Sequence, residues 1–241
     1  MSKIILPKEK VLPFFDAKWK ISEEKKLKSA YYRTNPNVKI YVDLLKNKKK
    51  VSVLDLGCGD GRFTIKYALA GFKTLGIDFS RYAIKRLLKR AKSLNLIHLT
   101  KGKVADITKI NYGNNEFDGV SCCNTLHYFN DLELKKIIGK MKKATKEGGL
   151  NYIPFEAEIN MELPDGRRFQ FEGQSYKSVE ETGKFLENLY KDWKIIKLSK
   201  SENNIRATLP ENIGKLLKTK STYYKRHFIV VDFIARKILN K

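Results

Sequence analysis

The chain has little of what builds disulfide scaffolds, zinc sites or membrane spans. It has only three cysteines (Cys58, Cys122 and Cys123), none in a C-x-x-C pair, and only three histidines. So few of these residues argue against a disulfide framework and against a zinc site. No apolar run approaches the roughly 18 residues of a transmembrane helix. Residues 1–9 are charged and lack the apolar core of a signal peptide, so we expect a cytoplasmic protein.

Acidic residues are also scarce relative to basic ones, 26 against 49, which gives a formal net charge of +23. This charge is either an electrostatic footprint for nucleic acid or a solvated lysine coat. Two basic helices, predicted near 80–92 and 131–143, fall on opposite faces of the predicted sheet, which favours the coat. Arg167, Arg168, Lys177 and the run 215–226 predict instead a basic entrance that attracts an anionic substrate.

Hydrophobic patterning predicts an α/β fold, namely a doubly wound, mostly parallel sheet with an antiparallel pair at its end. Its 241 residues suit a single domain with an N-terminal part (1–45), a core (46–156) and C-terminal insertions and strands (157–241). We expect residues 1–20 to form an extended arm that packs through its aromatics, followed by a charged helix over 22–34 with Ser22 as N-cap and a helix over 38–45. The expected strands are 51–56, 73–77, 101–105, 117–123 and 150–155, then 193–198 paired with 226–234. Further helices are expected at 63–70, from the Ser80 cap to about 91, from the Asp131 cap to Gly148–Gly149, and at 179–189.

The chain is organised around residues 51–63, where an apolar strand runs into a glycine-rich turn and then a helix. Gly57, Gly59 and Gly61 at this spacing allow a tight turn and a close approach of the backbone to a ligand. This context predicts a site for a cofactor that contains a nucleoside. Asp55 and Asp60 flank the turn, and their negative charge disfavours a pyrophosphate but suits an ammonium group.

Further polar groups follow the other predicted strands. Asp78 lies 17 residues beyond Gly61, where a carboxylate can accept hydrogen bonds from the two hydroxyls of a ribose. Asp106 and Ile107 follow the third strand, and Cys123 and Asn124 follow the fourth. Because ligands of doubly wound sheets bind beyond the carboxyl ends of the strands, we expect these groups to converge on one site. A dinucleotide and S-adenosylmethionine (SAM) both fit Asp78, and the acids of the turn favour SAM.

The segments 53–61, 76–78, 105–107 and 116–127 resemble the successive signature motifs of class I SAM-dependent methyltransferases. More weakly, the part after 155 resembles the small methyltransferases of the tellurite-resistance type. The resemblance implies a seven-stranded sheet that ends in an antiparallel hairpin, with SAM as cofactor and no metal. It implies that the methionine part of SAM lies against the glycine-rich turn, the ribose at the end of the second strand, the adenine after the third and the sulfonium after the fourth. The residues implied, in that order, are Asp55, Gly57, Cys58, Gly59 and Gly61; Asp78, Phe79 and Ser80; Asp106 and Ile107; and Cys123 and Asn124.

We therefore expect a methyltransferase that acts on a small molecule. The predicted basic entrance would suit an acceptor with an anionic group. The alternatives are a methyltransferase of RNA or protein, favoured by the net charge, and a SAM-binding module without activity. His127 is a candidate general base or else a structural histidine. Cys122 or Cys123 as a nucleophile would need a depressed pKa. Trp19, Tyr31 and Tyr32 either cap the site or pack the N-terminal arm on the sheet.

Overall fold

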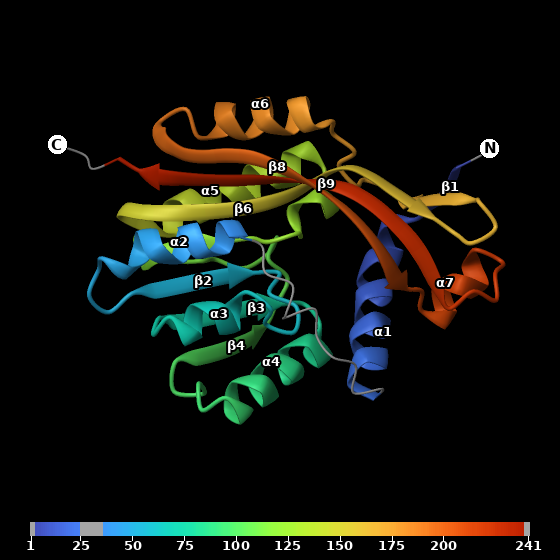
Figure 1. Cartoon of the computed structure of the whole chain (residues 1–241), viewed down its shortest axis with the longest axis horizontal. Helices are drawn as coiled ribbons and strands as arrows, with labels where there is room; N and C mark the ends of the chain where they lie inside the picture. Colours follow the sequence, from blue (N-terminus) through green and yellow to red (C-terminus); the bar gives the residue numbers. More distant parts are fainter. Residues whose placement is uncertain (1–2, 25–35, 239–241) are drawn as a thin grey trace.

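The computed structural model describes residues 3–24 and 36–238, which form a nine-stranded sheet with helices on both faces (Figure 1). Seven strands form the core in the order β4-β3-β2-β5-β6-β9-β8, in which β4 to β6 are parallel and β9 is antiparallel to both neighbours. The predicted doubly wound sheet with a C-terminal antiparallel hairpin is therefore confirmed. The strands are β1 (Lys3–Leu6), β2 (Ser52–Leu56), β3 (Lys73–Asp78), β4 (Thr100–Val104), β5 (Phe117–Ser121), β6 (Thr145–Glu162), β7 (Arg168–Phe171), β8 (Trp193–Thr208) and β9 (Tyr223–Lys237).

Two helical layers cover the core of the sheet. Because successive side chains of a strand point to opposite faces, Val53 packs toward one layer while Leu54 and Leu56 pack toward the other. The first layer includes α2 (Pro36–Lys46) and α3 (Thr64–Leu69), and the second is formed by α5 (Asp131–Ala144) and α6 (Val179–Leu189). Helix α4 (Arg81–Ser93) packs beside α3, and its predicted Ser80 cap accepts a hydrogen bond from the Ala83 N–H. None of the described helices is long and apolar enough to cross a membrane.

The long strands β6, β8 and β9 continue past the core into an extension with its own apolar cluster (Figure 1). Beyond the end of β5, strand β7 pairs with the distal part of β6, and β1 pairs with β7. Helices α1 (Val11–Glu24) and α7 (Glu211–Leu216) pack onto this extension through residues such as Phe14 and Ile213. The extension places α1 opposite the carboxyl ends of the core strands, so that helix and sheet face each other.

Several expected boundaries were wrong. Residues 11–24 are helical, not extended, because Pro13 lies in the first turn of α1, where a helix needs no backbone N–H donor. Ser22 lies in the last turn of α1, so it is not an N-cap, and the remainder of the helix predicted over 22–34 falls mostly outside the described residues. Helix α5 is capped by Asn130 and Glu133 in a reciprocal capping box, not by Asp131. It ends at Ala144, before the two glycines that were expected to end it.

Candidate functional site

A cavity of about 1460 Å³ lies at the carboxyl ends of β2, β3, β4 and β5, beside the parallel part of β6. All the predicted cofactor residues except Gly61 and Ser80 line it, so the structure brings together residues from four strand ends. Helix α1 and the distal parts of β8 and β9 form the remaining walls. Gly61 packs under α4, where a side-chain carbon would lie 2.3 Å from Leu87 Cδ1, and Ser80 caps that helix.

The glycine-rich turn has the backbone conformation that its sequence predicts. Gly57 has a φ of +65°, in the left-handed region, and a Cβ at this position would lie 2.4 Å from Thr125 Oγ1. The Cys58 N–H donates to the Ile77 carbonyl oxygen at 3.0 Å, which ties the turn to the end of β3. The turn therefore requires glycine at position 57, and its residues Gly57, Cys58 and Gly59 line the cavity.

Asp78 joins the glycine-rich turn to the start of α4. Its two carboxylate oxygens accept hydrogen bonds from the Gly59 and Ser80 N–H groups, each at 2.9 Å. The carboxyl group is 5% exposed, and burial raises its pKa to about 6. A carboxylate oxygen has more than one lone pair, so Asp78 keeps acceptor capacity toward the cavity, which fits the hydroxyls of a ribose.

Asp55 is more deeply buried than Asp78, with 1% exposure. Its carboxylate accepts hydrogen bonds from Thr64 Oγ1 at 2.6 Å and from Ser121 Oγ at 2.9 Å. Burial raises its pKa to about 6, because desolvation outweighs these hydrogen bonds. Asp55 thus reaches the cavity as a charged group whose burial opposes folding.

We expect Asp55→Asn to stabilise the ligand-free protein at pH 7.5 by about 1–2 kcal/mol, since two pKa units correspond to about 2.7 kcal/mol before relaxation. An amide fits both hydroxyl partners, because each can also accept. The pKa of Asp55 is raised above its unfolded value, so the free-energy cost of burying its charge disappears as pH falls through 6 toward 4. The stabilisation by Asp55→Asn should disappear over the same pH range. Urea unfolding at pH 7.5 and 4.5 measures this; an equal gain at both pH values would contradict the assignment.

Asp60 does not act as the sequence predicted. Its carboxylate pairs with the guanidinium groups of Arg90 at 2.9 Å and Arg86 at 3.6 Å, and Arg90 also donates to the Asp60 carbonyl oxygen at 2.8 Å. These arginines belong to α4, so Asp60 clamps the turn against that helix, and its negative charge is already balanced. The sequence signal for this pairing was the basic face of α4, which we interpreted as a solvated coat.

The third and fourth strand ends contribute one paired and one unpaired polar side chain. Asp106 Oδ1 accepts from the N–H and Oγ1 of Thr108, at 2.9 and 2.7 Å, which fixes the loop after β4. Asn124 has a φ of +53°, and its N–H donates to the Pro154 carbonyl oxygen at 2.9 Å. Among the described residues, the buried Asn124 Oδ1 has no hydrogen-bond donor. An orphaned acceptor in a polar cavity fits a ligand that brings N–H or O–H groups.

The cysteines are buried thiols. Cys58 and Cys123 line the cavity, whereas Cys122 lies in the apolar core under α5. Burial raises the pKa of all three well above its usual value. Thiolate chemistry needs the opposite shift, so the geometry offers none of them as a nucleophile.

His127 is fully buried and does not line the cavity. Its Nε2 lies 3.1 Å from a guanidinium nitrogen of Arg226 and 3.5 Å from Glu156 Oε2. Burial, together with the Arg226 charge, lowers the pKa of His127 well below its usual value. The ring is thus a neutral member of a buried network behind the cavity wall, where it cannot contact a substrate directly.

The wall opposite the strand ends includes three charged residues, of which we predicted only Arg226, as part of the basic run 215–226. Lys18 comes from α1, Glu156 from β6 and Arg226 from β9, and all three line the cavity. Trp19 also lines it, and its ring lies so close to the turn that a Cβ on Gly59 would be 2.8 Å from Cζ2. A charged residue inside an apolar strand, as at 156 and 226, was the available signal. Tyr31 and Tyr32 lie outside the described residues.

The predicted basic entrance is dispersed. Arg167 bonds to Asp165 and to the Leu217 carbonyl oxygen, and Lys177 pairs with Asp131 at 2.8 Å. Neither they nor Arg168 line the cavity, and only Arg226 of the predicted basic groups does. The prediction assumed that these cations lie in insertions on the substrate side of the sheet, whereas the β6–β7 turn carries Arg167 away from the strand ends.

The chain is similar to known methyltransferases. Residues 53–149 match a family described as a methyltransferase domain. A probable SAM-dependent methyltransferase TehB of Haemophilus influenzae is 28% identical over 196 residues, which are 81% of this chain and 60% of that protein. Phosphoethanolamine N-methyltransferase 3 of Arabidopsis thaliana is 28% identical over 58% of this chain and 27% of that protein. The chain thus spans less than two thirds of the length of either relative.

Solved structures share the fold. The crystal structure of TehB from Haemophilus influenzae superposes with a TM-score of 0.59 at 22% identity, covering 92% of this chain and 67% of that one. The [4+2]-cyclase SpnF superposes with a TM-score of 0.64 at 13% identity over the whole of both chains. These likenesses establish the fold, and the cyclase shows that the fold alone does not fix the reaction. The matched family shows that residues 53–149 form a methyltransferase domain, and the similarity to TehB supports SAM as its cofactor.

Proposed function

We propose that the protein transfers the methyl group of SAM to a small-molecule acceptor. One observation carries the proposal: the cavity that holds the predicted cofactor residues continues into a compartment walled by α1 and the β8–β9 extension. The acceptor would occupy this compartment, with its nucleophilic atom toward the end of β5. SAM supplies an electrophilic methyl group, so the protein has to bind, align and exclude water.

The residues at the strand ends have separate binding roles in this proposal. Asp78 accepts hydrogen bonds from the ribose hydroxyls, and Asp106 and Ile107 contact the adenine. The glycine-rich turn, with Asp55 beneath it, takes the methionine part. Cys123 and Asn124 lie under the sulfonium, where the orphaned Asn124 Oδ1 supplies an acceptor for a ligand donor group. No described residue is needed as a metal ligand for a displacement of this kind, because the sulfonium already carries a positive charge and leaves as a neutral thioether.

The character of the compartment supports a small molecule over a macromolecule. Phe15 and Trp19 of α1 and Phe228 of β9 give it apolar walls, and these side chains lie between the extension and the sheet. Pockets for small ligands combine such walls with a few polar groups. The named substrate of the plant relative, phosphoethanolamine, is also a small molecule.

A labelling experiment tests the acceptor class. The protein is incubated with SAM that carries a trideuterated methyl group and with a cell extract separated into small-molecule, RNA and protein fractions. We expect the label in the small-molecule fraction, as a metabolite heavier by one trideuteromethyl group. Asp78→Ala provides the control that cannot hold the cofactor. Label only in RNA or protein would show a macromolecular acceptor, and tight SAM binding without any transfer would show a binding module.

A further inference from the structure

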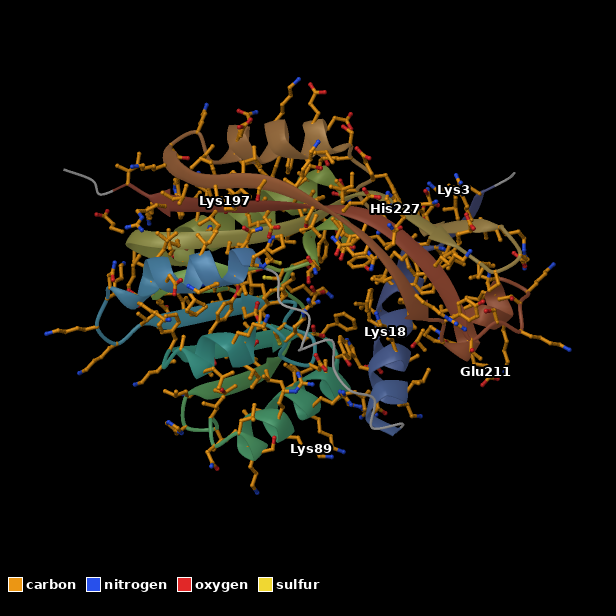
Figure 2. All side chains as sticks on the ribbon, in the orientation of Figure 1. Lys3, Lys18, Lys89, Lys197, Glu211 and His227 are labelled. Atoms are coloured by element: carbon orange, nitrogen blue, oxygen red, sulfur yellow. The ribbon has the colours of Figure 1, made fainter. Side chains whose placement is uncertain are left out.

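Three charged side chains meet in the acceptor compartment: Lys18, Glu156 and Arg226. Glu156 is 3% exposed and Arg226 is 7% exposed, so both are nearly removed from water. Figure 2 shows Lys18 on α1, the helix that faces the strand ends. Within this group of three side chains, two cations stand against one acid, so positive charge and hydrogen-bond donors are in excess.

Arg226 is held rigidly. One of its terminal nitrogens donates to Glu156 Oε2 and also lies 3.1 Å from His127 Nε2. Because a guanidinium can only donate, His127 Nε2 must accept, which places the ring proton on Nδ1. The centre of the Tyr128 ring lies 4.0 Å from the centre of the His127 ring, so Tyr128 packs against this network. His127 and Glu156 therefore position Arg226, which accounts for a buried histidine behind the wall.

Each of the two cations has unused donors. Arg226 Nε is buried and has no acceptor among the described residues. Lys18 forms neither a hydrogen bond nor an ion pair within the described parts of the chain, and its ammonium lies 5.5 Å from the centre of the Phe15 ring. Arg226 Nε is a buried donor without an acceptor, which is costly, so a ligand that brings acceptors is favoured at this position.

We propose that Lys18 and Arg226 form an anion subsite that binds a carboxylate or phosphate group of the acceptor molecule. Such groups only accept hydrogen bonds, and so they match two unused cationic donors. The apolar walls formed by Phe15, Trp19 and Phe228 would take the body of the same molecule. The inference rests on the proposed function and narrows it to acceptors with an anionic group.

The charge of Lys18 sets the pH range of this subsite. Burial, and then the Arg226 charge, lowers the pKa of Lys18 to about 8. The other charges that act on it are those of Glu156 and Asp60, which favour the ammonium form. The lysine is therefore mostly protonated at pH 7, and anion binding should weaken as pH rises through 8.

Binding of matched probes tests the subsite. S-adenosylhomocysteine first fills the cofactor half of the full-length protein, and benzoate, phenyl phosphate or the neutral benzamide is then titrated by calorimetry. We expect benzoate or phenyl phosphate to bind at least about tenfold tighter than benzamide at pH 7, since a hydrogen bond to a charged group is worth about 1.5–3 kcal/mol. The stronger of the two anions identifies the group as a carboxylate or a phosphate.

Variants locate the effect. Lys18→Met and Arg226→Met should each reduce anion affinity about tenfold or more and leave benzamide binding unchanged. Lys18→Arg should retain the anion affinity, and that affinity should no longer decline above pH 8. Lys20→Met, on an exposed part of α1, and Lys225→Met, an exposed neighbour on β9, are the matched controls. Lys18→Met keeps the test valid if the Arg226 variant does not fold.

The outcomes separate this inference from the proposed function. Failure of S-adenosylhomocysteine to bind would overturn the proposed function itself. Normal binding of S-adenosylhomocysteine, with anions no tighter than benzamide or with Lys18→Met unchanged, would overturn the subsite and leave the methyltransferase assignment intact.

Discussion

Replacing Asp78 with alanine should reduce the affinity for SAM by at least about 100-fold. The carboxylate is placed to accept hydrogen bonds from both ribose hydroxyls, and each such bond to a charged group is worth about 1.5–3 kcal/mol. It also accepts the Gly59 and Ser80 N–H groups, so its removal loosens the turn that cradles the cofactor. Isothermal titration calorimetry measures the loss, and Asp43→Ala, which removes an exposed carboxylate on α2, is the matched control.

The same carboxylate makes SAM binding dependent on pH. Burial raises the pKa of Asp78 to about 6, above the unfolded value of about 3.9. Only the ionised form is a full acceptor, so affinity should be complete above pH 7 and fall as pH decreases through 6. Asp78→Asn should bind weakly at every pH. Wild-type affinity that stays constant from pH 5 to 8, or an Asp78→Ala variant with normal affinity, would remove the ribose assignment.

The core of the fold could be predicted because its signals are local. The apolar residues of α4 recur at helical spacing, and the structure buries Ile84, Leu87 and Ala91. Helix α6 begins and ends where its pattern predicts, after a Ser178 cap. The cofactor residues follow the same logic, because each lies where an apolar strand ends, and parallel strands bring such ends to one edge.

The extension could not be predicted from local patterns. Residues 199–208 are mostly polar, yet they form the distal half of β8, because β9 satisfies their backbone hydrogen bonds. Strand propensity depends on the environment of a residue as much as on its type. Here that environment is β9, whose paired residues lie about thirty positions or fewer further along the chain. The helical α1 was missed for a related reason: Phe14 and Phe15 pack on β7 and on Tyr128, partners that the sequence does not identify.

The acceptor compartment was missed because its residues are far apart in the sequence. Glu156 and Arg226 are separated by 70 positions, and Lys18 lies in a segment that we expected to be extended. The motifs at 53–61, 76–78, 105–107 and 116–127 define the cofactor half, whereas the acceptor half depends on how three separate elements pack. Cofactor identity could thus be predicted from the sequence, and the acceptor could not.

The buried pair formed by Arg226 and Glu156 predicts a second large effect. Arg226→Met leaves the Glu156 carboxylate without its guanidinium partner in a site that is 3% exposed. Breaking a buried ion pair on one side costs about 3–5 kcal/mol, because the remaining charge is uncompensated. We therefore expect Arg226→Met to lower the free energy of unfolding by about this amount at pH 7.5, as measured in urea. Burial raises the pKa of Glu156 even with its partner present, so loss of Arg226 should favour the protonated acid and make the cost smaller at low pH.

The double variant Arg226→Met/Glu156→Gln should recover most of that loss, because it removes both charges together. The exposed pair of Arg168 and Glu162, 3.7 Å apart, is the control: the same substitutions there should cost less than about 1 kcal/mol. A double variant as unstable as Arg226→Met would show that the guanidinium packs rather than pairs. If the double variant folds and binds S-adenosylhomocysteine normally but no longer distinguishes benzoate from benzamide, then the pair is dispensable for the fold. The role of the buried Arg226–Glu156 pair would then be to bind the acceptor and not to stabilise the fold.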